Sequence, residues 1–279
     1  MDFSWIESII YGFVTGLTQI LPVSAQAHQA LMLKMFGQST EGGLMALLIH
    51  GAVFAAVYIS YADQIGHMLR ENRLARIPRR KRKRQPVMQR VLDYRLMKMA
   101  FYVIAVGFFV YPSLQAWRLD LSKIAIFFVI NGLMQYIPMF IPTGNKDSRN
   151  MTRMDGLWIG LFGALGIVPG ISRTGGMISV ATVRGADPGH AVNWAVMLTM
   201  PAMAVFMCID FYSMFALGIG SLGITVLLRY IVAAAAAYAG TYIAVRLVRI
   251  FASTTGFSGF AYYSWGAALF SLILYLSIS

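Results

Sequence analysis

Residues 169–176 read PGISRTGG and interrupt a long apolar segment near the middle of the chain, in which Arg173 is the only charged residue between positions 157 and 183. An arginine at membrane depth is costly, so it is usually paired, solvated or functional. Its planar guanidinium binds phosphate oxygens in a bidentate way. Glycine, proline and serine break a helix and can turn backbone N–H groups inward, which also suits an anion. The stretch predicts a phosphate cradle inside a membrane; the alternative is a helix-end arginine that snorkels to the interface.

The composition indicates an integral membrane protein. Hydrophobic residues make up 58% of the chain and charged residues only 12%, about half the charged share of a soluble domain. Several apolar stretches reach the roughly 20 residues that a membrane-crossing helix needs. We therefore expect an all-α fold in a single membrane domain over residues 1–279. The one cysteine, Cys208, excludes an intrachain disulfide, suggests no thiol metal site, and is expected in the core.

The net charge of +12 is concentrated in one segment. Residues 65–98 hold twelve basic residues against two acidic ones, with an unbroken cationic run at 79–84. Such a run can bind nucleic acid, but a short loop between membrane spans offers no module for reading it. The positive-inside rule instead places a basic loop 65–98 in the cytoplasm, where it meets anionic membrane lipids. We therefore expect no nucleic-acid partner.

With that loop inside, the other apolar segments give six spans with the basic loops on one side. Asp210 and Arg229, on consecutive spans near the predicted outer side, are expected to pair, and His50 is expected to serve packing. The predicted spans are 44–61, 97–112, 122–142, 190–212, 222–248 and 260–278.

Two apolar segments, 5–36 and 157–183, do not read as simple spans because each is broken by a polar turn. Irregular backbone at membrane depth is tolerated only where protein or water covers it, so each is expected to be a re-entrant helix pair, the first from outside and the second from inside. Glycine lies six residues before the proline of each turn. This pattern predicts inverted repeats over about 1–142 and 150–279, with a site near the midplane. Four side chains are expected to converge there: Ser24, His28, Ser172 and Arg173.

Residues 12–28 (GFVTGLTQILPVSAQAH) and 169–175 (PGISRTG) resemble the two motifs of the undecaprenyl-diphosphate phosphatase (bacitracin-resistance) family of bacterial membranes. The likeness extends over the whole chain in span order. It implies removal of the terminal phosphate from a 55-carbon isoprenoid diphosphate, which regenerates the lipid carrier of cell-wall (peptidoglycan) precursors in the plasma membrane. It also implies homodimers and a divalent cation, Mg²⁺ or Ca²⁺.

The chain departs from the family pattern in its first motif. The family has glutamates three and seven residues before the proline, where this chain has Gln19 and Thr15, and Ala25 replaces the second serine of a pair. A hard cation prefers carboxylate oxygens, so metal binding is expected to be weak and no metal ligand is assigned. His28 matches the family histidine, and the Ser-Arg-Ser of the second motif survives with threonine as its last member.

The residues that remain suit an anionic headgroup. Arg173 is expected to clamp phosphate, His28 to act as general base or nucleophile, and Ser24 or Ser172 to attack or to bind phosphate. Gln19 and Thr15, four residues apart on one helix face, are either substrate contacts or polar links between helices. The expected substrate-binding residues are Ser172, Arg173, Thr174, Gly170, Gln19 and Thr15.

Two functions stay open at this point. One is a phosphatase that acts on undecaprenyl diphosphate. The other is a catalytically impaired homologue that transports, flips or binds a polyprenyl phosphate or diphosphate, because an inverted repeat around a midplane anion site is also the layout of an alternating-access transporter.

Overall fold

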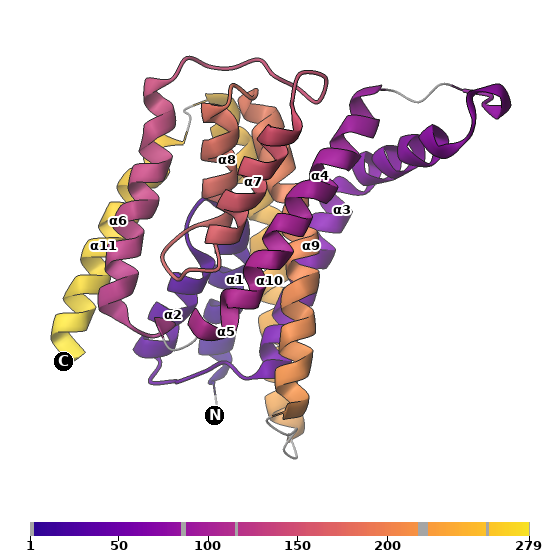
Figure 1. Cartoon of the computed structure of the whole chain (residues 1–279). Helices are drawn as coiled ribbons and strands as arrows, with labels where there is room; N and C mark the ends of the chain where they lie inside the picture. Colours follow the sequence, from indigo (N-terminus) through magenta and orange to yellow (C-terminus); the bar gives the residue numbers. More distant parts are fainter. Residues whose placement is uncertain (1–2, 85–87, 115–116, 217–222, 255–256, 279) are drawn as a thin grey trace.

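The computed structural model describes residues 3–84, 88–114, 117–254 except 217–222, and 257–278. In this part of the chain every regular element is a helix, which confirms the predicted all-α class (Figure 1). The helices are α1 Trp5–Ile20, α2 Ala25–Met35, α3 Gly43–Arg76, η1 Arg79–Lys81, α4 Met88–Gly107, η2 Phe108–Val110, α5 Tyr111–Leu114, α6 Leu121–Tyr136, η4 Ile137–Phe140, α7 Arg153–Leu165, α8 Arg173–Val183, α9 Pro188–Ala216, α10 Ile224–Thr254 and α11 Ser258–Ile278.

Five of the described helices are long and apolar enough to cross a membrane, so the chain is a multi-pass membrane protein. They are α3, α6 with η4, α9, α10 and α11. The one predicted span without a counterpart among the five is 97–112, which lies in α4, η2 and α5. α4 carries Arg90, Asp93, Arg95 and Lys98, which lower its mean hydropathy.

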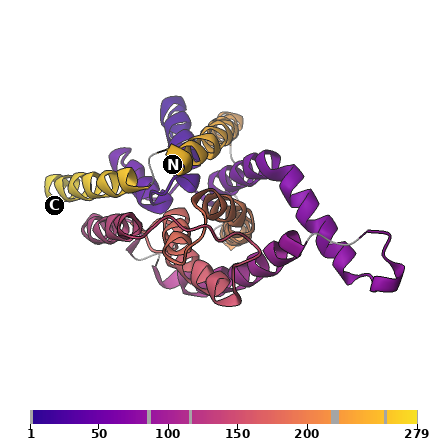
Figure 2. The same ribbon diagram turned by 90° about the horizontal axis from the view of Figure 1, so that it is seen from above.

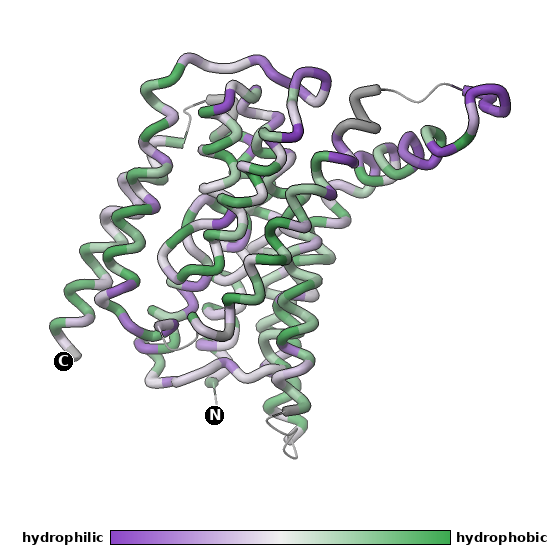
Figure 3. The backbone as a smooth tube through the Cα atoms, viewed as in Figure 1, coloured by the Kyte–Doolittle hydropathy of each residue, from purple (hydrophilic) through white to green (hydrophobic). Residues whose placement is uncertain are grey.

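The predicted basic loop 65–98 is helical over most of its described length. α3 continues to Arg76, η1 follows, and α4 begins at Met88, so the segment forms an arm that projects beyond the bundle (Figures 1 and 2). α3 and α4 stay helical within this segment because their apolar residues pack: Met68 of α3 and Leu96 of α4 are both buried in the main core cluster. Hydrophilic residues gather on this basic arm and in the loop between η4 and α7, at the same end of the bundle (Figure 3). We call it the basic end; both chain termini lie at the opposite end (Figure 1).

The two broken segments form helical hairpins that do not cross the bundle. α1 has 16 residues, α7 has 13, and α2 and α8 have 11 each. At 1.5 Å per residue the longest of them is about 24 Å, less than the ~30 Å hydrocarbon core. The α1–α2 hairpin comes in from the end that carries the termini and the α7–α8 hairpin from the basic end (Figure 1). Each first helix begins with a capping box, Ser4 with Glu7 and Thr152 with Asp155.

Small residues let the first hairpin lie close to its neighbour. Gly12 and Gly16 of α1 face the backbone of α10 at Ala233 and Ala237, where a Cβ atom would collide with the carbonyl groups. Four-residue spacing of glycines is the usual device for close helix contact in membranes. Thr241 adds a hydrogen bond from its Oγ1 to the Gly16 carbonyl at 3.1 Å. In the other half of the chain α7 packs on α4, which is the contact that an inverted repeat would require; the repeat itself stays a prediction.

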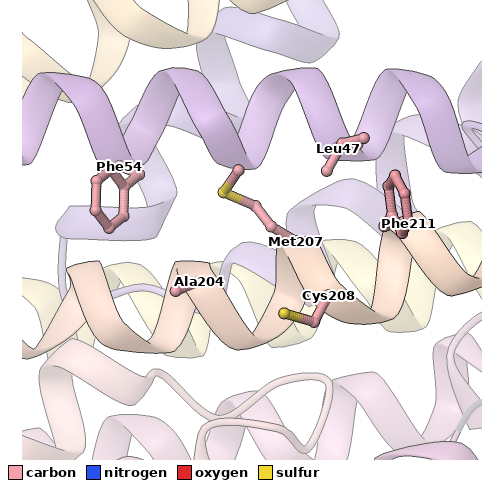
Figure 4. Close-up of a pocket in the computed structure, with 6 residues that line it drawn as sticks. All are labelled: Leu47, Phe54, Ala204, Met207, Cys208 and Phe211. Atoms are coloured by element: carbon pink, nitrogen blue, oxygen red, sulfur yellow. The ribbon is translucent and has the colours of Figure 1, made fainter.

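Four side chains in the spans differ from expectation: His50, expected to serve packing, Asp210, Arg229 and Cys208. Asp210 pairs with His50 at 2.6 Å instead of Arg229, because α9 packs directly against α3. Arg229 donates to the Phe3 carbonyl at 2.9 Å. Cys208 is exposed rather than in the core, and it lines an apolar groove between α3 and α9 with Phe54 and its other neighbours (Figure 4).

Candidate functional site

The turns of the two hairpins meet inside the bundle through three hydrogen bonds. The Gly170 N–H donates to Ser24 Oγ at 3.0 Å. Arg173 Nη2 donates to Gln19 Oε1 at 3.1 Å, and Thr174 Oγ1 donates to the Gln19 carbonyl at 3.2 Å. The two motifs that the sequence singled out are therefore adjacent in space, at the inner tips of hairpins that come from opposite ends.

Each hairpin presents the N-terminus of its second helix to this meeting point. Ser24 caps α2, with its Oγ accepting from Ala27 N–H at 3.4 Å, and Ser172 caps α8, with its Oγ accepting from Gly175 N–H at 3.0 Å. A helix N-terminus carries a partial positive charge and free N–H groups, which favour an anion. The guanidinium of Arg173, in the first turn of α8, adds a full positive charge.

A small polar cavity lies between the tips, and we call it the anion cradle. Its lining residues are Thr18, Gln19, Val23, Ala25, Gln26, Gly166, Ile171, Ser172, Arg173, Thr174 and Phe206. Its volume is about 20 Å³, enough for about one water molecule. A phosphate group fits only after side chains such as Gln19 move aside, so the cradle in this conformation is closed.

Two buried donors of the cradle have no hydrogen-bond partner. Arg173 is 8% exposed and Gln26 is 9% exposed, yet Arg173 Nε and Gln26 Nε2 are both unsatisfied. Leaving such a group unpaired costs about 1–3 kcal/mol. Among the described residues no carboxylate pairs with Arg173. Because both orphan groups are donors, the missing partner is an acceptor, such as an oxygen of an anion or of a water molecule.

His28 faces a different cavity. Its Nδ1 lies 2.6 Å from the Ser24 carbonyl and its Nε2 lies 2.6 Å from the Tyr263 hydroxyl. A carbonyl only accepts, so Nδ1 carries the proton and the Nε2 of a neutral ring accepts from tyrosine. The ring also stacks on Tyr263, with 5.7 Å between centroids. His28 lines an apolar groove against α11 and does not line the cradle, so only part of the predicted four-residue cluster shares one cavity.

Thr15, another predicted substrate contact, is buried and does not line the cradle. Its Oγ1 has no hydrogen-bond partner, and it is fully enclosed. Thr15 therefore does not act as a polar link between helices, whereas Gln19 does, through Arg173.

Sequence reasoning missed a polar pair on α6 that holds both turns. Asn131 Oδ1 accepts from Ser172 N–H at 2.8 Å, and Gln135 Nε2 donates to the Pro22 carbonyl at 2.5 Å. Two amides four residues apart on one face of an apolar helix are a signal that would have found them. Tyr263 was also missed, and its position among the other tyrosines of the chain carried no such signal.

The donor set does not fit a divalent cation. Gln19 offers one neutral oxygen, and that oxygen already accepts from the guanidinium of Arg173. A cation at this oxygen would lie next to a full positive charge without a carboxylate to offset it. No group of three or more His, Cys, Asp or Glu side chains suited to a metal occurs in the described ranges. The cradle therefore lacks the oxygen ligands that a divalent cation would need.

The chain is similar to known proteins over almost its whole length. The family described as bacitracin resistance protein BacA matches residues 8–270. A protein named undecaprenyl-diphosphatase from Carboxydothermus hydrogenoformans is 27% identical over 96% of both chains. Another of that name from Alkaliphilus metalliredigens is 26% identical over 96% of this chain and 98% of its own length. A third, from Treponema denticola, is 31% identical over 72% of each chain.

Proposed function

The chain belongs to the BacA family, and we propose that it is an undecaprenyl-diphosphatase that recycles the lipid carrier of cell-wall synthesis. The observation that carries this proposal is the anion cradle, where two buried donors, Arg173 Nε and Gln26 Nε2, lack acceptors between two helix N-termini. A diphosphate offers the oxygens that would satisfy them.

Phosphoryl transfer depends mainly on positioning and on neutralising charge. Arg173 and the first turns of α2 and α8 would bind the two phosphates. Water attacks the terminal phosphorus, the bridging P–O bond breaks, and the products are undecaprenyl phosphate and inorganic phosphate. The proton of the attacking water passes to His28 Nε2. For this step the His28 ring has to leave its 2.6 Å contact with the Tyr263 hydroxyl and turn from the apolar groove toward the cradle.

The two serines differ in what they can contribute. Ser24 Oγ already accepts from two N–H groups, those of Gly170 and Ala27. A hydroxyl has two lone pairs, so Ser24 has none left for attack. Ser24 does not line the closed cradle, and its O–H would reach phosphate only when the cradle opens. Ser172 Oγ accepts from Gly175 alone and keeps one lone pair. If a covalent step occurs, Ser172 is its nucleophile.

The comparisons lend no support to the alternative of a catalytically impaired homologue that carries or flips the lipid. The relatives reported above are all named as diphosphatases. The family glutamates, which suit a divalent cation, are absent at positions 15 and 19. In our proposal Arg173 and the two helix N-termini together supply the positive charge of the site.

The surroundings of the enzyme follow from the same family membership. We place it in the bacterial plasma membrane with the basic end in the cytoplasm, where Arg79–Lys81 and their neighbours meet anionic lipid headgroups. A homodimer belongs to the proposal through the family likeness alone.

Phosphate release from undecaprenyl diphosphate by the purified protein in detergent tests the function. We expect turnover by the wild type and a loss of about 10²–10³-fold in kcat for Arg173→Ala, by analogy with the removal of one donor to a developing oxyanion. Arg229→Ala is the matched control, because Arg229 is also an arginine inside an apolar span but lies outside the cradle. Absence of release by a folded wild type would refute the proposal.

A further inference from the structure

The largest of the described cavities near the cradle is the apolar groove that His28 faces, between α1, α11 and the end of α10. We propose that it holds the first isoprene units of the lipid whose headgroup lies in the cradle. The inference rests on the proposed function and extends it from the headgroup to the chain. We call this cavity the tail groove.

The groove has the chemistry of a hydrocarbon site. Its volume is about 640 Å³, within the range of ligand pockets. Leu17 and Leu21 line one side, and Phe251 and Phe260 line the other. The polar side chains among its lining are few, and His28 and Tyr263 engage each other.

The groove lies next to the cradle. Thr18 and Val23 line both cavities, so a molecule with a polar head and an apolar chain would occupy the two together once these shared side chains move and the cradle opens. His28 marks the junction, because its Nδ1 donates to the carbonyl of Ser24, whose Oγ contacts the second hairpin, while its ring faces the groove.

The position of the groove indicates that its occupant comes from the bilayer. It is formed by the inner half of α1 and by the parts of α10 and α11 that lie toward the basic end (Figure 1). Gly259 and Tyr262 of α11, both exposed, belong to its lining. Both lie in the first turns of α11, near the basic end, so the groove opens on the outer surface of the bundle, where a lipid can enter it. The four aromatic rings, of Phe251, Phe260, Tyr262 and Tyr263, suit a bulky, methyl-branched chain.

The volume sets how much of the chain the groove holds. If each carbon takes the ~30 Å³ of one liquid water, the groove holds roughly 20 carbons, or about four isoprene units. The remaining units of a 55-carbon chain would lie in the bilayer. The affinity of the wild type should therefore rise with chain length up to about four units and change little beyond that.

A substitution at Gly259 blocks the groove with little risk to the fold. A Cβ atom at Gly259 meets nothing within 4 Å, and the same holds for Gly266 on the same helix. Gly259 lines the groove and Gly266 does not. Gly259→Trp therefore fills the groove, and Gly266→Trp is a matched control with the same added bulk on the same helix.

The experiment measures binding and hydrolysis of isoprenyl diphosphates of one, three, four and eleven units, with thermal unfolding as a check on folding. For the eleven-unit lipid we expect Gly259→Trp to lose at least about tenfold in affinity and in kcat/KM, while the one-unit compound and Gly266→Trp stay within about twofold. Equal behaviour of the two tryptophan variants would overturn the inference. So would a wild-type affinity that ignores chain length, or displacement of the lipid by ordinary phospholipid at equal concentration.

The outcomes separate this inference from the proposed function. If the wild type binds the eleven-unit lipid without hydrolysing it and Gly259→Trp abolishes that binding, the function is wrong and the groove is right. If the wild type hydrolyses the lipid and Gly259→Trp does so equally well, the function stands and the groove assignment fails. The chain-length series needs no variant, so misfolding of Gly259→Trp would leave a decisive measurement.

Discussion

The two hairpins share a plan but not a chemistry. Both begin at a capping box, turn at depth, and resume with an 11-residue helix capped by serine. The α7–α8 hairpin carries Arg173 at its tip, whereas the tip of α1–α2 offers only neutral groups and one histidine. The second hairpin is also tied at its wide end by an ion pair between Asp155 and Arg184, and among the described residues the first has no equivalent pair.

The hydrogen bonds between the hairpins all run in one direction. Gly170, Arg173 and Thr174 of the second hairpin donate, and Gln19 and Ser24 of the first accept. In the described part of the chain no bond runs the other way. The first hairpin therefore supplies the acceptors that a phosphate would otherwise supply. Binding of a diphosphate would replace these acceptors, and the Gln19–Arg173 contact is the first to be exchanged because it involves the charged donor.

The largest effect should come from replacing the planar guanidinium of Arg173, the charged donor of the cradle. Arg173→Lys keeps the positive charge but loses two donors of the planar guanidinium. These are Nη2, which donates to Gln19, and Nε, which is free to bind phosphate. We expect kcat for undecaprenyl diphosphate to fall about 100-fold, measured as phosphate release. Arg229→Lys, outside the cradle, should keep full activity. If Arg173→Lys does the same, charge alone suffices and the contrast between the hairpins loses its chemical meaning.

Next in size is the anchor of the second hairpin. Asn131→Leu removes the acceptor of the Ser172 N–H in a site that is fully buried. An unsatisfied buried N–H costs about 1–3 kcal/mol, so we expect a lower thermal unfolding temperature in detergent and weaker substrate binding. Ser264→Ala is the control, because it removes the other partner of Asn131 and leaves the Ser172 contact in place. Equal loss in both variants would show that Asn131 acts within the α6–α11 contact and not on the turn.

Sequence reasoning reached the fold and the pairing of motifs because both depend on strong local signals. Proline and glycine at membrane depth mark the turns, and Arg173 stands out in an apolar segment. It did not separate His28 from the cradle, because the side of a helix that a ring faces depends on the packing of α11, which is distant in the chain. The same holds for Asp210, whose partner His50 was set by the packing of α3 against α9.

A third prediction converts the first hairpin to the family pattern. In the wild type, a chelator should leave turnover unchanged, because Gln19 faces a guanidinium and offers no carboxylate. Thr15→Glu with Gln19→Glu adds two carboxylates on one face of α1, which suit a hard cation. We expect this double variant to gain about tenfold in turnover with Mg²⁺ or Ca²⁺ and to lose the gain with chelator.

The matched control for that variant is Thr15→Gln with the native Gln19, which adds bulk at the same position without charge. A wild type that already stops working in chelator would contradict the prediction. It would mean that oxygens other than those of Thr15 and Gln19 hold a cation, and the donor–acceptor division between the hairpins would have to be revised.

The smallest effect concerns the histidine of the first hairpin. Tyr263→Phe removes the hydroxyl that donates to His28 Nε2 at 2.6 Å and leaves the stacked ring in place. A neutral hydrogen bond is worth about 0.5–1.5 kcal/mol, and each 1.36 kcal/mol is tenfold in rate. If that hydroxyl must leave before His28 accepts a proton, kcat rises by roughly two- to tenfold with KM unchanged. Tyr275→Phe, on the same helix but outside the tail groove, should leave kcat as it is. A fall in kcat for Tyr263→Phe would instead mean that the hydroxyl orients the His28 ring during the reaction. In that case α11 holds the base of the first hairpin in place and does not block it.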